Sequence, residues 1–184
     1  MDKTKKLIEA TLIAPLRQGN LDSLCGMYAV INAIRLTHAR SKPLKRQDEK
    51  LLFDAGVRFL SRKQYLVDAS IEGMIGRTQI RLAKHLIAQA NERLNTKFKL
   101  HQLNVKRSTY SDIIEGEIDA GRPVCVLFDG ALDHYSVIVG YSKSRFILFD
   151  SEGLAWLRRD LCQLSGGKGD ARHAIEKHAL FIFK

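Results

Sequence analysis

A cysteine followed by a long apolar run lies near the start of the chain, where residues 18–36 read QGNLDSLCGMYAVINAIRL. The apolar residues of this run recur at helical spacing, at Ala29, Val30, Ala33 and Ile34. Asp22 and Ser23 are residue types that cap helices, so we expect a largely buried helix with Cys25 in its first turn. The free N–H groups at a helix N-terminus stabilise a thiolate, which makes Cys25 a candidate nucleophile. The adjacent Gly26 has no side chain to block a substrate.

The middle of the chain favours helices. Residues 46–62 and 78–94 place apolar side chains on one stripe and basic side chains elsewhere, which predicts two amphipathic helices. A short acidic helix is expected over residues 109–120, because a glycine and a proline follow it. Between these helices, residues 98–105 alternate in a way that predicts a strand.

The C-terminal third favours strands, because the hydrophobic period after Pro123 changes from about 3.6 residues to two. The predicted strands span residues 124–128, 135–141, 145–149 and 179–183. Residues 142–144 form a hairpin connection, so the second and third strands should pair antiparallel. A last helix is expected at 158–164 and a mobile glycine-rich segment at 166–169. Helices first and an antiparallel sheet later predict one α+β domain over residues 1–184.

A histidine and an aspartate lie at neighbouring ends of the predicted hairpin. His134 begins one strand, which holds an imidazole rigidly, and Asp150 follows the strand paired with it. Together with Cys25 they predict a nucleophile, a base and an orienting acid. His134 would take the proton of Cys25 and return it to a leaving amine, while Asp150 fixes the imidazole. The backbone N–H of Cys25 and the amide of Gln18 are the expected oxyanion donors.

Residues 18–33, 133–141 and 149–151 resemble papain-like cysteine peptidases. Within that clan they are similar to the peptidase domains that remove double-glycine leaders from bacteriocins and to josephin-type deubiquitinases. The resemblance implies a papain-like fold, in which an N-terminal helix bearing the Cys packs on a C-terminal antiparallel sheet bearing the His and Asp. It implies catalytic roles for Cys25, His134, Asp150 and Gln18.

Two positions depart from the pattern of those families. Gln18 lies seven residues before Cys25 instead of five or six, so either the loop bulges or Asn20 serves as the oxyanion donor. Ser151 replaces the usual proline after the acid.

The positive charge lies in one part of the chain. The 184 residues carry a net charge of +10 and are 45% hydrophobic, which excludes a disordered chain. Residues 35–107 hold 17 of the 30 Lys and Arg residues and six of the 20 Asp and Glu residues, a net charge of +11. This basic helical segment, at about 38–107, therefore lies beside a nearly neutral active site, and Arg77, Arg81 and Lys84 are expected to dock an acidic partner.

The three cysteines and the hydrophobicity pattern bear on location. Their odd number and the absence of a CxxC pair argue against disulfides and zinc, so a cytoplasmic, reducing location is expected. No run of 18 apolar residues occurs, so no membrane association is expected. Cys125, Cys162 and Trp156 are interpreted as packing residues, and His38 as an ordinary surface or boundary residue.

The residues leave several functions open. A cysteine peptidase or isopeptidase acting on a peptide or protein is the first, and an acyltransferase or deamidase with the same triad is the second. A non-enzymatic basic module that binds nucleic acid or a peptide is the third, although the chain lacks the interleaved aromatic residues and helix-turn-helix pattern of nucleic-acid binding. His173 and His178 are five residues apart and do not form the His-Glu-x-x-His motif of a metalloprotease helix, so neither a metal nor a cofactor is expected.

Overall fold

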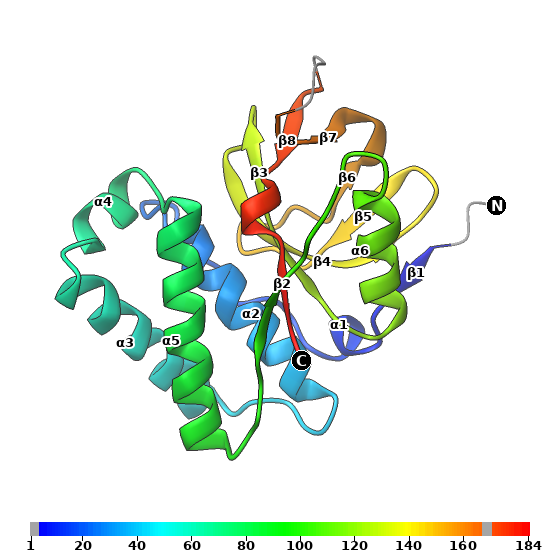
Figure 1. Ribbon diagram of the computed structural model, residues 1–184. Coiled ribbons are helices and arrows are strands. Elements are labelled where there is room, and N and C mark those ends of the chain that lie inside the picture. Colours follow the sequence, from blue (N-terminus) through cyan, green and yellow to red (C-terminus); the bar gives the residue numbers. More distant parts are fainter. Residues whose placement is uncertain (1–3, 167–170) are drawn as a thin grey trace.

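The computed structural model describes residues 4–166 and 171–184 and has an α+β fold (Figure 1). Helix α2 (Cys25–Ala39) packs on strands β3 (Val124–Gly130), β4 (His134–Tyr141) and β9 (Phe181–Phe183). Helix α6 (Tyr110–Asp119) also packs on β3 and β4. Every residue from His134 to Gly140 is buried, as expected for a strand covered on both faces. The predicted α+β class is therefore confirmed.

Helix α2 begins at Cys25, as predicted, but its N-terminus is organised differently. Leu24 is the N-cap residue and no side chain caps the helix. Asp22 instead orders the preceding loop, because its two carboxylate oxygens accept the N–H groups of Leu24 at 3.1 Å and Gly19 at 3.0 Å. The first N–H groups of the helix are therefore left without a side-chain cap at the end that carries the cysteine.

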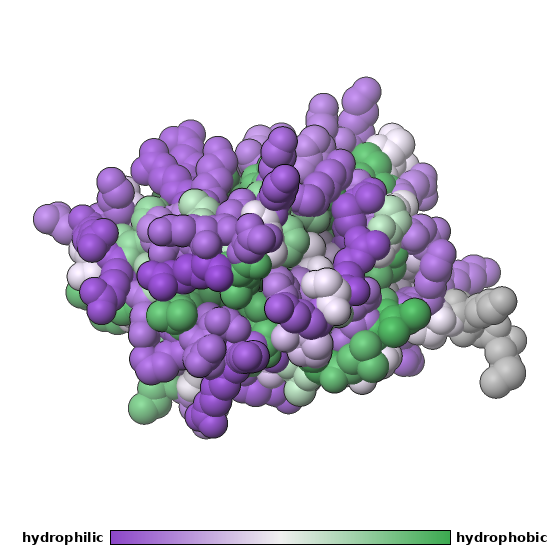
Figure 2. Space-filling model, turned by 90° about the horizontal axis from the view of Figure 1, so that it is seen from below, coloured by the Kyte–Doolittle hydropathy of each residue, from purple (hydrophilic) through white to green (hydrophobic). Residues whose placement is uncertain are grey.

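A layer of helices packs beside α2 and contains the basic segment (Figure 1). Helix α3 (Arg46–Arg62) has the predicted bounds, and α5 (Gly76–Leu94) begins two residues before the predicted start. A short helix, α4 (Leu66–Ile71), was not predicted. The face seen in Figure 2 is mostly hydrophilic, with smaller apolar patches between the polar side chains. Among the helices of the described residues, none is long and apolar enough to cross a membrane.

The sheet has the order β2-β9-β3-β4-β5-β6, and neighbouring strands on this path are antiparallel. The remaining strands on the path are β2 (Leu100–Gln102), β5 (Arg145–Leu148) and β6 (Trp156–Arg158). Strand β8 (His173–Ile175) pairs with β3 and, in parallel, with β7 (Cys162–Leu164). At the N-terminus, β1 (Lys5–Lys6) pairs with β4 and leads into the short helix α1 (Glu9–Leu12).

The register of the β4–β5 hairpin brings the ends of two strands together. Tyr141 pairs with Phe146 and Ile138 with Leu148, with an irregularity between Ile138 and Gly140. The N–H of Phe149 donates to Val137 O at 2.8 Å. The chain that leaves β5 therefore runs beside the start of β4, as the predicted antiparallel hairpin requires.

The predicted helix at 158–164 is wrong. The segment contains the end of β6, a 3₁₀ turn at Arg159–Leu161 and strand β7. Cys162 and Leu164 are buried and Gln163 is only partly so, an alternation that suits a strand paired with β8. The predicted strand at 98–105 forms only over β2, and of the glycine-rich segment at 166–169 all but Gly166 lies outside the described residues.

Of the three residues expected to pack in the interior, the two cysteines are buried and the tryptophan is not. Cys125 and Cys162 are buried, as predicted. Trp156 is instead 43% exposed, with the Arg145 guanidinium 4.0 Å from its ring centre. The expectation for His38 is also wrong, because this side chain is buried and its Nδ1 lies 2.7 Å from Lys42 O.

Gly26 has a packing role in place of the expected open access. It is buried, and a Cβ at this position would lie 2.7 Å from Met74 Cε and 3.1 Å from the Tyr135 ring. The glycine therefore lets the first turn of α2 approach Tyr135, the residue after His134.

We predict that Gly26→Ala destabilises the protein by about 1–3 kcal/mol, because the methyl group overpacks this contact. Gly116→Ala is the matched control, since α6 leaves open space around Gly116 and alanine favours a helix by about 0.5–1 kcal/mol. Urea denaturation measures both variants. A Gly26→Ala protein as stable as wild type would contradict the close packing.

Candidate active site

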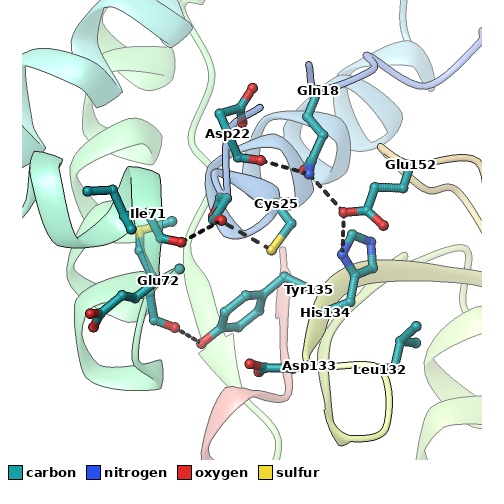
Figure 3. Close-up of a pocket in the computed structure, with 13 residues that line it drawn as sticks. Gln18, Asp22, Cys25, Ile71, Glu72, Leu132, Asp133, His134, Tyr135 and Glu152 are labelled. Carbon is teal, nitrogen blue, oxygen red and sulfur yellow. Dashed lines mark hydrogen bonds and ion pairs between the residues drawn. The ribbon is translucent and has the colours of Figure 1, made fainter. Parts of the chain in front are cut away.

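A cavity of about 300 Å³ lies where α2 begins and β4 begins (Figure 3). Gln18, Cys25 and His134 line it, and Asp150 is bonded to His134. The candidate site residues predicted from the sequence are therefore close together in the structure, although they lie far apart in the chain. The segment that follows α4 forms the opposite wall, with Glu72, Gly73 and Met74.

The loop before Cys25 is tied to that opposite wall. Ser23 N donates to Ser70 O and Ser23 Oγ donates to Ile71 O, both at 3.0 Å. Farther in, the buried Tyr135 hydroxyl donates to Met74 O at 2.9 Å. Helix α4 and the residues after it are thus held to both α2 and β4. Cys25 Sγ lies 3.9 Å from Ser23 O, on the cavity side of the helix terminus (Figure 3).

Asp150 binds the imidazole of His134 at Nε2 and thereby fixes the position of the ring. Its Oδ2 lies 2.7 Å from His134 Nε2, and both side chains are almost fully buried. Its Oδ1 accepts the backbone N–H groups of Glu152, Gly153 and Leu154 at 2.8, 2.9 and 3.1 Å. The carboxylate therefore orders the loop after β5 and fixes the ring at the same time, which leaves Nδ1 on the cavity side.

The electrostatics of this pair favour a charged imidazole. Burial opposes the charge on His134, but the hydrogen bonds and charges of Asp150 and Cys25 outweigh it and raise the pKa of His134 to about 10. Burial also opposes the charge on Asp150, but the contact with His134 outweighs it and lowers the pKa of Asp150 below its ordinary value of 3.8. The pair is thus an ion pair at neutral pH.

Ser151, the departure from proline, orients Gln18. Its hydroxyl donates to Gln18 Oε1 at 3.1 Å, and its carbonyl oxygen accepts the Gln18 backbone N–H at 3.2 Å. This leaves Gln18 Nε2 to face the cavity, where it also donates to Asp22 O at 3.3 Å. Asn20 is exposed and lines a neighbouring hollow, so the structure brings Gln18, and not Asn20, to the cavity with Cys25.

Glu152 is a cavity residue that the sequence reasoning missed. Its Oε1 accepts from Gln18 Nε2 at 2.8 Å and lies 3.4 Å from His134 Nδ1 (Figure 3). The carboxylate thus binds the amide donor and the cavity-facing ring nitrogen together, although half of the side chain is exposed. The one signal in the sequence is that Glu152 lies two residues after Asp150, in a loop whose path depends on Asp150.

The expectation of a nearly neutral site is wrong. Asp22, Glu72, Asp133 and Glu152 line the cavity, and no Lys or Arg of the described residues does so. A net charge summed along a segment counts all its charged side chains equally, whether or not they point towards the cavity. Four acidic side chains from different parts of the sequence line the cavity, whereas no Lys or Arg in the part of the chain that the structure describes does.

The other two cysteines differ from Cys25 in their surroundings. Burial raises the pKa of the Cys125 thiol strongly, and burial together with Asp160 raises that of Cys162 to about 12. Neither thiol is ionised at neutral pH, so Cys25 is the candidate nucleophile. Within residues 4–166 and 171–184, no three His, Cys, Asp or Glu side chains are grouped as metal ligands.

In comparisons with known proteins, no family model and no curated protein matches the chain. The chemistry of the site therefore follows from its geometry: a thiol at a helix N-terminus, an imidazole fixed by a carboxylate, and an amide donor in one cavity.

We predict that His134 titrates near pH 10 and that Asp150→Asn lowers this midpoint by about one unit or more. NMR of the imidazole resonances measures this midpoint, and Asp112→Asn, at an exposed position on α6, is the control. The pKa in the folded protein lies above the ordinary 6.5, so protonated His134 stabilises the fold. This stability is complete below pH 6.5 and is lost as the pH rises towards 10. A wild-type midpoint near 6.5 would contradict the ion pair.

Proposed function

We propose that this chain is a papain-like cysteine peptidase or isopeptidase that cleaves a peptide or protein substrate through a thioester on Cys25. The observation that carries the proposal is the His134 imidazole, bonded at Nε2 to Asp150 and presenting Nδ1 to the cavity that holds the thiol. A papain-like arrangement is supported by the packing of α2, which begins at Cys25, on β4, which begins at His134.

The reaction needs two proton transfers through one imidazole. His134 starts as the imidazolium, so Cys25 reacts as the thiolate paired with it, and Sγ attacks the carbonyl carbon of the scissile amide. The C–N bond then breaks as Nδ1–H gives its proton to the leaving amine, which leaves the thioester and a neutral imidazole. Water, deprotonated by the neutral His134, attacks the thioester and releases a carboxylic acid, the Cys25 thiolate and the imidazolium. Asp150 holds the ring in place and stabilises its charged form throughout.

The tetrahedral intermediate requires donors for its oxyanion. The backbone N–H of Cys25 and Nε2 of Gln18 are the two candidates. Gln18 Nε2 now donates to Glu152, so a substrate carbonyl must replace that carboxylate. Because the Glu152 side chain is half exposed, it has solvent into which to turn.

A same-triad acyltransferase is the second candidate, and one feature favours it. The acidic lining of the cavity, Asp22, Glu72, Asp133 and Glu152, attracts a protonated amine, which is the acceptor in transfer to lysine. The two reactions share the thioester and differ only in what attacks it. Mass spectrometry of products in the presence of a lysine peptide separates them, since hydrolysis gives a free carboxylate and transfer gives a new amide.

Reaction with an iodoacetamide probe tests the nucleophile. At neutral pH we expect rapid labelling of Cys25, loss of labelling in Cys25→Ala, and slowing by about tenfold or more in His134→Ala, because the imidazolium stabilises the thiolate. Peptide mapping checks that Cys125 and Cys162 react slowly. Equal rates for wild type and His134→Ala would overturn the proposal.

Gln18→Ala is expected to lower cleavage of a fluorogenic peptide, selected from a combinatorial library, by about 100-fold. Iodoacetamide labelling should stay close to the wild-type rate, because alkylation forms no oxyanion. Ser151→Ala should show a smaller loss of the same kind, since it releases Gln18 Oε1. Exposed Gln47→Ala is the matched control. Unchanged cleavage in Gln18→Ala would remove Gln18 from the oxyanion site.

A further inference from the structure

A second hollow, of about 550 Å³, continues from the cavity of Cys25. Glu72, Gly73, Met74 and Asp133 line both spaces, so the two adjoin where the segment after α4 faces the β3–β4 turn. A substrate segment bound at Cys25 therefore lies next to the second hollow.

The second hollow combines apolar and acidic groups. Tyr65, Ala69 and Leu127 supply apolar surface. The carboxylates come from both walls: Asp68 and Glu72 from α4 and its end, and Asp129, Asp133 and Glu176 from the sheet side. No Lys, Arg or His of the described residues lines this hollow, which we call the acidic groove and define by these five carboxylates.

Within the described residues, no Lys, Arg or His forms an ion pair with a carboxylate of the acidic groove. Of the 20 acidic residues, two lie outside the described residues and nine form ion pairs. Of the remaining nine, six line the cavity or the acidic groove, and all five of the groove are among them. Arg81 approaches the groove, because its Nη1 donates to the Tyr65 hydroxyl at 3.4 Å. Arg77, Arg81 and Lys84 share a neighbouring hollow with Glu176, but none of the three lines the groove itself.

The charges of the acidic groove also affect Tyr135, which lines the cavity of Cys25. Burial is the main cause that raises the pKa of Tyr135, followed by the charges of Cys25, Asp133, Glu176 and Asp129. The Tyr135 hydroxyl bonds to Met74 O, and Met74 lines both hollows. The carboxylates of the groove therefore act electrostatically on Tyr135, a residue that also lines the cavity of Cys25.

We propose that the acidic groove binds a lysine or arginine side chain of the substrate, so that the enzyme selects a peptide with a basic residue close to the scissile bond. The inference rests on the proposed function. A basic side chain fits both parts of the lining, since its aliphatic stem covers Leu127 and Tyr65 while its charge meets the carboxylates. Charge complementarity selects this occupant over an acidic or neutral one.

Exposed apolar side chains at the rim of the groove could contact the substrate residues on either side of the basic residue. Val67, Ile71 and Ile75 are 67%, 70% and 71% exposed, and they lie on α4 and on the segment between α4 and α5. Ile71 lines the cavity of Cys25 and Ile75 lines the groove. Apolar neighbours of the basic residue would cover these side chains.

Paired peptides test the proposal. Internally quenched octapeptides of alanine and glycine carry lysine or norleucine at one position, so each pair differs only in the ammonium group. At one position we expect lysine to raise kcat/KM by about tenfold or more, with the ratio falling at high salt. Asp68→Asn combined with Asp129→Asn should remove most of this ratio, because kcat/KM for the lysine peptide falls towards the value for the norleucine peptide. Asp112→Asn, at an exposed position on α6, should keep the ratio.

Binding to Cys25→Ala, which does not cleave, separates the two claims. Fluorescein-labelled versions of the same peptides should bind about tenfold more tightly with lysine than with norleucine. A lysine ratio near one at every position, or a ratio that survives Asp68→Asn with Asp129→Asn, would overturn the basic-residue site. Failure of His134-dependent labelling at Cys25 with the lysine preference in binding intact would overturn only the peptidase.

Discussion

The hydrogen bond between Asp150 Oδ2 and His134 Nε2 is the contact on which the rest of the site depends. The register of the β4–β5 hairpin brings the two residues together, and the three backbone N–H groups on Asp150 Oδ1 hold the following loop. That loop carries Ser151, which orients Gln18, and Glu152, which meets both Gln18 and the ring. One buried carboxylate therefore positions the imidazole of His134, the amide of Gln18 and the carboxylate of Glu152.

The features that were predictable from the sequence are those with local causes. The helix from Cys25 follows from a mostly apolar run with helical spacing, and the hairpin that joins His134 to Asp150 follows from two alternating segments with a short connection. The features that were missed depend on distant partners. The strand at Cys162–Leu164 exists because β8 pairs with it, and the position of Glu152 follows from the bonds that Asp150 makes. Neither partner is visible in a local pattern.

The net charge of the chain is positive, whereas the side chains that line the cavity and the acidic groove are mainly acidic. Summed along the sequence, the excess of Lys and Arg in residues 35–107 predicts a basic surface beside a neutral site. In the folded protein, Arg77, Arg81 and Lys84 line a groove on α5, whereas the carboxylates of the adjoining acidic groove form no ion pair within the described part of the chain. Folding separates charges that composition adds together, because the direction of each side chain depends on its place in an element. A basic protein thus has an acidic groove beside Cys25.

Capture of the covalent intermediate tests the central claim most directly. The protein is mixed with an activated peptide ester, quenched in acid within the first turnover, and analysed by intact mass and peptide mapping. The account predicts one acyl group on the fragment that contains Cys25, removable by hydroxylamine and absent in Cys25→Ala. Turnover without an acyl adduct, or an adduct on Cys125 or Cys162 instead, would contradict a thioester at the start of α2.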